Sequence, residues 1–134
     1  MSEKLCAIRK RGGGGALTET ALWTNASPTS SFAAQNVTLS SGISNFEVIR
    51  VYYLCSTTEY YVDFPKDLIV AAFAEINAPL FVIGKTGTGG TSLFFVRVLR
   101  YVSNTSISIG ANTRVGASGT ANEGNVPTKI CGLK

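Results

Sequence analysis

The sequence predicts an all-β fold: an antiparallel β-sandwich, jelly-roll-like in its arrangement, with about eight strands. Only 15% of the 134 residues are charged, so uncharged polar residues and 14 glycines must form much of the surface. Val, Ile, Phe and Tyr, which favour strands, recur in short runs separated by turn-forming residues. Helix-capping patterns are scarce. These observations favour short strands joined by turns over a helical bundle.

The chain is predicted to form one domain preceded by a short arm. Apolar residues make up 45% of the sequence, enough for a single core. Residues 12–15 are four consecutive glycines, which give the backbone its greatest freedom and separate the basic run 9–11 from the rest. We therefore expect a basic arm and linker over 1–15 and a β-sandwich over 16–134. The arm is either a connector to a preceding part of an assembly, which we favour, or an edge strand that folds back.

The first half of the domain is predicted to alternate strands with turns. Strands are expected over 17–23, 32–39 and 46–55, because these runs are rich in apolar and β-branched residues. The clusters 24–29 and 40–42 separate them, since Pro, Gly, Ser and Asn favour turns.

The predicted strand 46–55 has two distinguishable faces, because successive side chains of a strand point to opposite sides of the sheet. Arg50 marks one of these faces as at least partly in contact with solvent. The other face is therefore the predicted core face. The core-face residues are Ile49, Val51, Tyr53 and Cys55, and the residues of the opposite face are Val48, Arg50, Tyr52 and Leu54.

The second half of the domain is predicted to continue in the same way. The run 67–75 is ambiguous, because its apolar residues suit either a buried strand or a turn of helix, and a strand is preferred. Residues 103–105 form a turn between two strand-like runs, which predicts a hairpin. The other strands are expected over 59–62, 80–83, 92–102, 106–110 and 127–134, with loops over 84–90 and 112–125.

The supply of residues argues against an enzyme. The sequence has no histidine, which removes the commonest general base and the commonest metal ligand. Its eight carboxylates show no spacing typical of an acid–base pair or a calcium loop. The cysteines, Cys6, Cys55 and Cys131, lie too far apart for a metal or redox motif, and we expect free thiols. No catalytic residue, metal site or cofactor is predicted.

Neither nucleic acid nor membrane insertion is predicted. The net charge is +4, and the one dense basic run, at 9–11, is typical of a solvated arm. Residues 84–86, Gly-Lys-Thr, resemble the end of a phosphate-binding loop, but Pro79 stands where that motif requires glycine. The apolar run 68–74 is far shorter than the roughly 20 residues that span a bilayer. No apolar stretch of signal-peptide length follows Met1, so we expect synthesis in the cytoplasm.

Residues 22–39 have the sequence LWTNASPTSSFAAQNVTL, and residues 126–134 have VPTKICGLK. Together these stretches resemble the small terminal domains of tail-associated proteins from phages and prophages of gut Gram-positive bacteria. In that family the patterns L-W-T-N, F-A-A-Q and a final K-I-Y-G-[IVL]-K recur. The resemblance covers most of 22–134, and Cys131 stands where an aromatic residue is usual. It implies an oligomeric component of a virion tail or tail fibre that helps to contact the host surface.

Two functions from different classes are compatible with the sequence. One is a receptor-binding module that recognises a bacterial surface polysaccharide. The other is a purely structural virion component, in the tail, the baseplate or a capsid decoration, that packs on copies of itself or on other virion tail proteins. For the first function, adjacent tyrosines in a strand must point to opposite faces, so at most one packs in the core and the other is free to stack on a sugar. The candidate ligand-binding residues are Tyr60, Tyr61, Glu59, Asp63, Thr86 and Thr88, in the polar segments 56–63 and 84–91.

We also expect a homo-oligomer, with a trimer preferred. The strands over 46–55 and 94–102 carry apolar residues on both faces, which is more than a sheet with one solvent-facing side should have. A second subunit would cover the additional apolar face.

Overall fold

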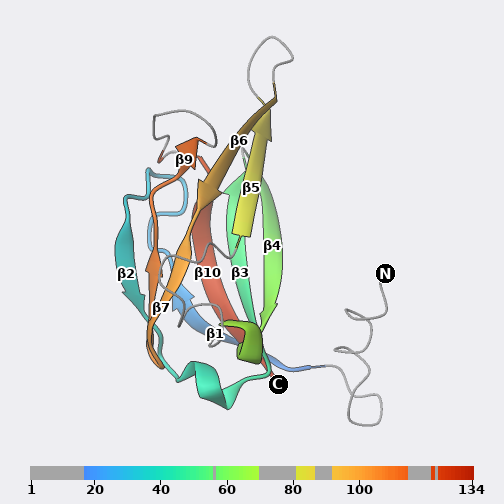
Figure 1. The fold of residues 1–134 in the computed structure, drawn as a ribbon. Helices are drawn as coiled ribbons and strands as arrows, with labels where there is room; N and C mark the ends of the chain where they lie inside the picture. The colour runs from blue at the N-terminus through green and yellow to red at the C-terminus, as the bar shows by residue number, and fades with distance from the viewer. Residues whose placement is uncertain (1–16, 56, 70–80, 87–91, 115–121, 123) are drawn as a thin grey trace.

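In the computed structural model, antiparallel strands are the main secondary structure of the residues described (Figure 1). Two of its sheets pack face to face around one core, so the predicted all-β class and the antiparallel β-sandwich are confirmed. The residues that the structure describes are 17–55, 57–69, 81–86, 92–114, 122 and 124–134.

Ten strands and one 3-10 helix are present within these ranges. They are β1 (Glu19–Thr24), β2 (Gln35–Thr38), η1 (Ile43–Asn45), β3 (Val48–Cys55), β4 (Thr58–Pro65), β5 (Phe81–Thr86), β6 (Ser92–Arg97), β7 (Leu99–Ser103), β8 (Ser106–Ile109), β9 (Thr113–Arg114) and β10 (Val126–Leu133).

Sheet A consists of four strands in the order β1, β10, β3 and β4. The strand β10, close to the end of the chain, therefore lies inside the sheet, between β1 and β3. Its pairing with β3 shifts register between Pro127 and Lys129, and its pairing with β1 shifts between Ala21 and Trp23. The hairpin of β3 and β4 is regular along its whole length, and β4 is the outer strand on this side of the sheet.

The other strands form two three-stranded sheets. Sheet B has the order β2, β8 and β7, and sheet C has the order β5, β6 and β9. A tight turn joins β7 to β8, which confirms the predicted hairpin. The long strand predicted over 92–102 is divided into β6 and β7 at Val98, whose carbonyl accepts a hydrogen bond from the backbone N–H of Gly110 (2.8 Å). This one segment therefore links sheet C to sheet B.

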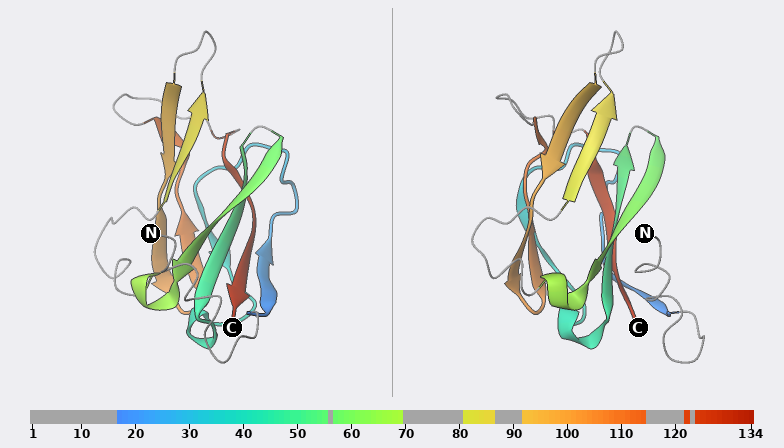
Figure 2. Two further views of the ribbon diagram at one scale, coloured as in Figure 1. Left: turned by 90° about the vertical axis from the view of Figure 1, so that its right-hand side faces the viewer. Right: turned by 45° about the vertical axis from the view of Figure 1, so that its right-hand side comes forward.

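Sheets A and B face each other across the core (Figure 2). On β3, Ile49 and Val51 are fully buried and Tyr53 packs against them, which confirms the predicted core face. The buried members of this cluster are Leu22, Phe32, Val37, Leu39, Ile43, Phe46, Ile49, Val51, Phe64, Ile69, Leu99, Ile107, Ile109, Val126 and Ile130.

The opposite face of sheet A also buries apolar side chains. Val48, Cys131 and Leu133 form a second, smaller cluster, and Leu17 and Tyr52 pack against it. Val48, an apolar residue on the second face of β3, is thus covered by the chain itself. For β3, the presence of apolar residues on both faces therefore does not by itself require another subunit.

The chain order follows a nested pattern. The first strand pairs with the last in sheet A, and β2 pairs with β8 in sheet B. These nested antiparallel pairs lie on the two facing sheets of the arrangement. The hairpins β3–β4 and β7–β8 are local additions to it.

Residues 66–69 are helical, so the strand predicted over 67–75 is wrong for 67–69. The remainder of that prediction lies outside the described residues. Ile69 is buried in the core, whereas Leu68 is 50% exposed, so only one of these neighbouring apolar side chains reaches the core. A uniformly apolar run has no period that could distinguish a strand from a turn of helix.

Several strand ends also differ from the prediction. β4 runs from Thr58 to Pro65, beyond the predicted 59–62, because Asp63 and Phe64 continue its pairing with β3. β5 ends only at Thr86, inside the predicted loop 84–90, and the short β9 lies within the predicted loop 112–125. The basic arm predicted over 1–15 lies outside the described residues.

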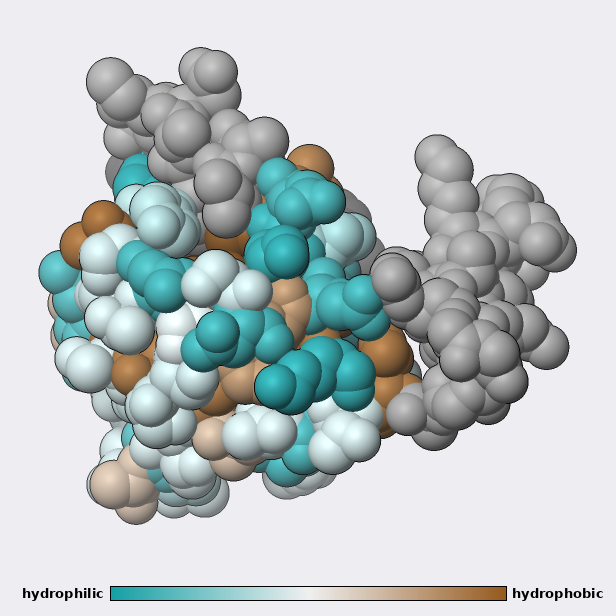
Figure 3. All heavy atoms as spheres, turned by 90° about the horizontal axis from the view of Figure 1, so that it is seen from below, coloured by the Kyte–Doolittle hydropathy of each residue, from teal (hydrophilic) through white to brown (hydrophobic). Residues whose placement is uncertain are grey.

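Large apolar side chains are exposed at scattered places rather than on one broad face. Figure 3, the view from below, shows apolar side chains in small patches between polar ones. No helix among the described residues is long and apolar enough to cross a membrane. Among the residues whose side chains the structure describes, the large exposed apolar ones are Tyr60, Tyr61, Leu68 and Val102.

Candidate binding site

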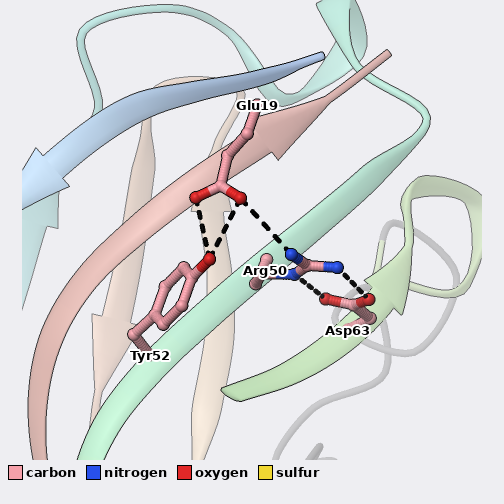
Figure 4. Close-up of polar contacts among 4 residues, drawn as sticks. All are labelled: Glu19, Arg50, Tyr52 and Asp63. Carbon is pink, nitrogen blue, oxygen red and sulfur yellow. Dashed lines mark hydrogen bonds and ion pairs between the residues drawn. The ribbon is translucent and has the colours of Figure 1, made fainter. Parts of the chain in front are cut away.

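The outer face of sheet A, the face turned away from sheet B, carries a group of interacting polar side chains. Alternation along β3 and β4 places Arg50 opposite Asp63 and Tyr52 opposite Tyr61 on this face. Glu19 of β1 reaches the same place across β10 (Figure 4). We call Glu19, Arg50, Tyr52 and Asp63 the polar cluster.

Arg50 is at the centre of the polar cluster. Its Nε donates to Oδ1 of Asp63 (2.7 Å) and its Nη2 donates to Oδ2 (2.9 Å), a bidentate pair (Figure 4). Its Nη1 donates to Oε2 of Glu19 at 3.3 Å. The hydrogen bonds to Asp63 outweigh the effect of partial burial and raise the pKa of Arg50 further above its ordinary value. The guanidinium thus ties β4 to β3 and β1.

Glu19 is held by several donors. The hydroxyl of Tyr52 lies 2.8 Å and 3.0 Å from its two carboxylate oxygens, and the thiol of Cys131 also hydrogen-bonds to it. Partial burial alone would raise the pKa of Glu19. The hydrogen bonds from Tyr52 and Cys131 and the charges of Arg50 and Lys129 outweigh burial, so the pKa is lowered. Glu19 is therefore a stable anion near neutral pH.

Two aromatic rings on this face are each covered on one side by a cation. The guanidinium carbon of Arg50 lies 4.1 Å from the ring centroid of Tyr61, and Nζ of Lys129 lies 4.3 Å from that of Tyr52. The two rings are tilted neighbours, with centroids 5.6 Å apart. Tyr61 is nevertheless 54% exposed, so much of its ring remains open to solvent.

Tyr60 lies on the opposite face of β4, the side that faces the core. Its ring stacks on Tyr53, with centroids 5.9 Å apart and an angle of 25° between the planes. Tyr60 is 48% exposed, so it is not a core residue. Strand alternation therefore separates the two adjacent tyrosines of the predicted site, and neither of them is buried.

The structure brings three of the six predicted ligand-binding residues onto one face, because Glu59, Tyr61 and Asp63 alternate along β4. Glu59 is exposed, and its Oε2 accepts a hydrogen bond from the hydroxyl of Thr128 (2.7 Å). The carboxylate of Asp63 is engaged by Arg50. Thr86 lies at the end of β5, and Thr88 is outside the described residues.

The sequence prediction missed the other members of the site. Arg50 and Tyr52 could have been found from the sequence, because both lie on the predicted non-core face of their strand. Glu19 and Lys129 could not, because β1 and β10 become neighbours of β3 only when the ends of the chain pair. No sequence spacing contains that information.

A second group of polar contacts is buried at the C-terminal end of β6, around Arg97. Arg97 is fully buried, and its five N–H donors all find backbone carbonyls as acceptors. Burial lowers its pKa to about 10, so it remains charged near neutral pH. The accepting carbonyls belong to Phe32, Gly110, Asn122, Gly124 and Asn125, at 2.8–3.1 Å.

The residues of the two sequence patterns that carry the family resemblance have structural positions. Leu22 is in the core, and Trp23 packs edge-on against Phe32. The side chain of Asn25 donates to the carbonyl of Pro127 (2.8 Å) and accepts from the N–H of Ser27 (2.8 Å). Asn25 therefore links the end of β1 to β10, whereas Leu22, Trp23 and Phe32 pack in or against the core.

The outer face of sheet A is suited to recognition by stacking and hydrogen bonding. It offers one half-exposed aromatic ring beside carboxylate and hydroxyl groups. Among the described residues, no group of three His, Cys, Asp or Glu side chains is placed to hold a metal ion. No model of a known protein family matches the chain, and no curated protein matches it.

Proposed function

We propose that this protein is a non-catalytic module of a phage tail or tail fibre that binds a bacterial surface polysaccharide through the outer face of sheet A. The observation that carries the proposal is the ring of Tyr61, which is half exposed on the outer strand β4 beside Glu59 and the polar cluster. In this proposal the protein is made in the host cytoplasm, assembles with other tail proteins and acts in the virion.

The physical basis is the fit between a pyranose ring and an aromatic face. The C–H groups of a sugar pack on an aromatic ring, while its hydroxyls donate to neighbouring oxygens. Arg50 holds one side of the Tyr61 ring, which fixes the ring's orientation before a ligand arrives. A preordered ring loses little conformational freedom on binding.

The test compares Tyr61→Ala with Tyr60→Ala. The two tyrosines have the same chemistry, adjacent positions and similar exposure but lie on opposite faces, so Tyr60→Ala is a matched control. Both variants should fold, because neither ring is buried. Tyr61→Ala should weaken binding to bacterial cells or wall polysaccharide roughly two- to tenfold, the value of one stacking contact of about 0.5–1.5 kcal/mol. Tyr60→Ala should bind like the parent.

If binding is reduced only in Tyr60→Ala, the ligand contacts the other face of β4 and not the outer face of sheet A. If both variants bind like the parent, the outer face of sheet A is not the binding site. Circular dichroism of each variant separates lost binding from lost folding.

A structural virion component is the second candidate function, and one observation favours it. Each charged member of the polar cluster is already paired with another member, as expected for a face whose role is to stiffen the sheet. In that case neither tyrosine variant would alter adhesion, and particles assembled with the Tyr61→Ala protein would show a defect in stability or assembly instead.

A further inference from the structure

We infer that the polysaccharide recognised by this face is uncharged. The inference rests on the proposed function and concerns which class of bacterial surface polymer fits: a neutral polysaccharide or an anionic one such as a teichoic acid. It rests on the contacts that the cations of the outer face of sheet A already make within the protein.

Arg50 is one of the two cations described on this face, and each of its three nitrogens already donates to a carboxylate. Two nitrogens are bonded to Asp63, the third is bonded to Glu19, and the plane of the guanidinium lies against Tyr61. An anionic ligand would compete with two carboxylates that already neutralise this guanidinium, one of them in a bidentate pair. Exchanging one anion for another at the same guanidinium gains little free energy.

Lys129 is the second cation described on this face, and it lies close to both Tyr52 and Glu19. Its ammonium lies over the ring of Tyr52, and its charge contributes to the lowered pKa of Glu19. The same face also carries three carboxylates among the described residues. They belong to Glu19, Glu59 and Asp63. The described residues of this face therefore have a formal charge of −1, which repels a polyanion.

The groups that remain available suit hydroxyl donors. Glu59 is exposed and uses Oε2 for Thr128, and a carboxylate has about four acceptor sites in all. The exposed part of the Tyr61 ring offers an apolar surface for sugar C–H groups. A neutral polyol supplies both partners and meets no electrostatic barrier.

The test uses the full-length chain on an array of purified neutral microbial polysaccharides and teichoic acids. We expect binding to a neutral polymer that Tyr61→Ala weakens and that changes by less than about twofold between about 50 and about 500 mM NaCl. The chain has a net charge of +4, so weak attraction to polyanions that is independent of Tyr61 is subtracted with the Tyr61→Ala protein.

Asp63→Asn sharpens the test because it removes the charged, bidentate partner of Arg50. This variant should gain Tyr61-dependent binding to teichoic acid at about 50 mM NaCl, and salt should weaken that binding roughly tenfold or more. Asp67→Asn is the matched control, since it removes the same charge from an exposed position in the helical turn 66–69. Thermal melts establish that both variants are folded.

Three results are decisive. If the parent binds teichoic acid in a Tyr61-dependent and salt-sensitive way, the inference is wrong while the proposed function stands. If Asp63→Asn and Asp67→Asn bind polyanions equally, the pairing of Arg50 is not what excludes them, and the inference again fails. Binding to no polymer on the array, with equal adhesion of the parent and Tyr61→Ala to cells, would overturn the proposed function itself.

Discussion

At the scale of single residues, the guanidinium of Arg97 has an unusual setting, since it is fully buried and bonded to five backbone carbonyls. We predict that Arg97→Met destabilises the protein by about 3 kcal/mol or more, because several carbonyls are left buried without a donor. Arg97→Lys should cost less, since an ammonium keeps the charge and three donors. Urea denaturation of both variants measures the free energy of unfolding.

Arg100 provides the control for that experiment. It lies three residues further along, on β7, and is only partly buried. Arg100→Met should change the free energy of unfolding by less than about 1 kcal/mol. Equal losses for the Arg97 and Arg100 variants would show that the carbonyl bonds do not contribute as described.

The burial of Arg97 illustrates a limit of sequence reasoning at this scale. Alternation places Arg97 in phase with Phe95 and Leu99, both of which are buried. Its charge nevertheless suggests a solvent-facing position, because unpaired arginines are rarely buried. The carbonyls that make burial possible come from loops distant in sequence, so the periodicity was informative but could not be trusted on its own.

Cys131 is expected to be unreactive in the native protein. Burial, together with the hydrogen bond to Glu19, raises the pKa of its thiol to about 12, so almost no thiolate is present at pH 8. Cys55 is only partly buried and should react with a thiol reagent without unfolding. In denaturant, all three cysteines of the chain should react. Modification of Cys131 at the same rate as Cys55 under native conditions would contradict the prediction.

The same pKa shift has a consequence for alkaline stability. The folded-state pKa of Cys131 lies above the ordinary value of 9.0 that applies to the unfolded chain. The thiol therefore contributes stability that is complete below pH 9 and is lost as the pH rises toward about 12. Cys131→Ala should remove this part of the pH dependence, which unfolding curves across that range would reveal.

At the scale of the elements, Gly132 sets how closely η1 and the segment after it approach β10. A Cβ atom at this position would overlap the ring of Phe46. Gly132→Ala should therefore destabilise the protein by about 1–3 kcal/mol, the usual range for overpacking. A double-mutant cycle with Phe46→Ala checks the cause, because removal of the ring should abolish most of the penalty. Additive losses would show that the clash is not responsible.

Glu19 joins β1 to β3 and makes the sheet sensitive to acid. Its pKa is lower in the folded protein than the ordinary 4.5, so it contributes stability at pH values above 4.5 that is lost as the pH falls through the folded value. Glu19→Gln should be less stable than the parent at pH 7 but should lose less stability on acidification. Asp67→Asn, at an exposed position, is the control. Parallel pH profiles for the parent and Glu19→Gln would contradict this role.

The sequence predicts where strands occur better than it predicts which strands lie next to each other. Alternation identified β3 and its core face, because Ile49 and Val51 repeat at a period of two. The hairpin of β7 and β8 followed from local turn residues. The placement of β10 between β1 and β3 rests on contacts between the two ends of the chain, which no local pattern records. That pairing is what brings Glu19 and Lys129 to the candidate site.

At the scale of the whole molecule, a small low-charge sandwich was predictable because composition alone sets how much core a chain of this length can form. The apolar pattern of the strands is weaker evidence for an oligomer than composition is for a single core. Apolar residues on both faces of β3 suggested a covering subunit, yet Val48 is buried in a cluster with Cys131 and Leu133 of the same chain. An oligomer remains a proposal, supported instead by the weakness that one stacking site must have.

We therefore predict that the protein in solution is a homo-oligomer, preferably a trimer of about 42 kDa built from 14.1 kDa chains. One stacked ring gives weak binding, and linked copies raise the effective affinity without new contacts. Size exclusion with light scattering at micromolar concentration measures the mass, and 14.1 kDa at every concentration would contradict the prediction. The Tyr61→Ala protein should keep the mass of the parent, because Tyr61 is proposed to face ligand. If that variant dissociates, Tyr61 lies in a subunit interface, and the structural role becomes the better account of this face.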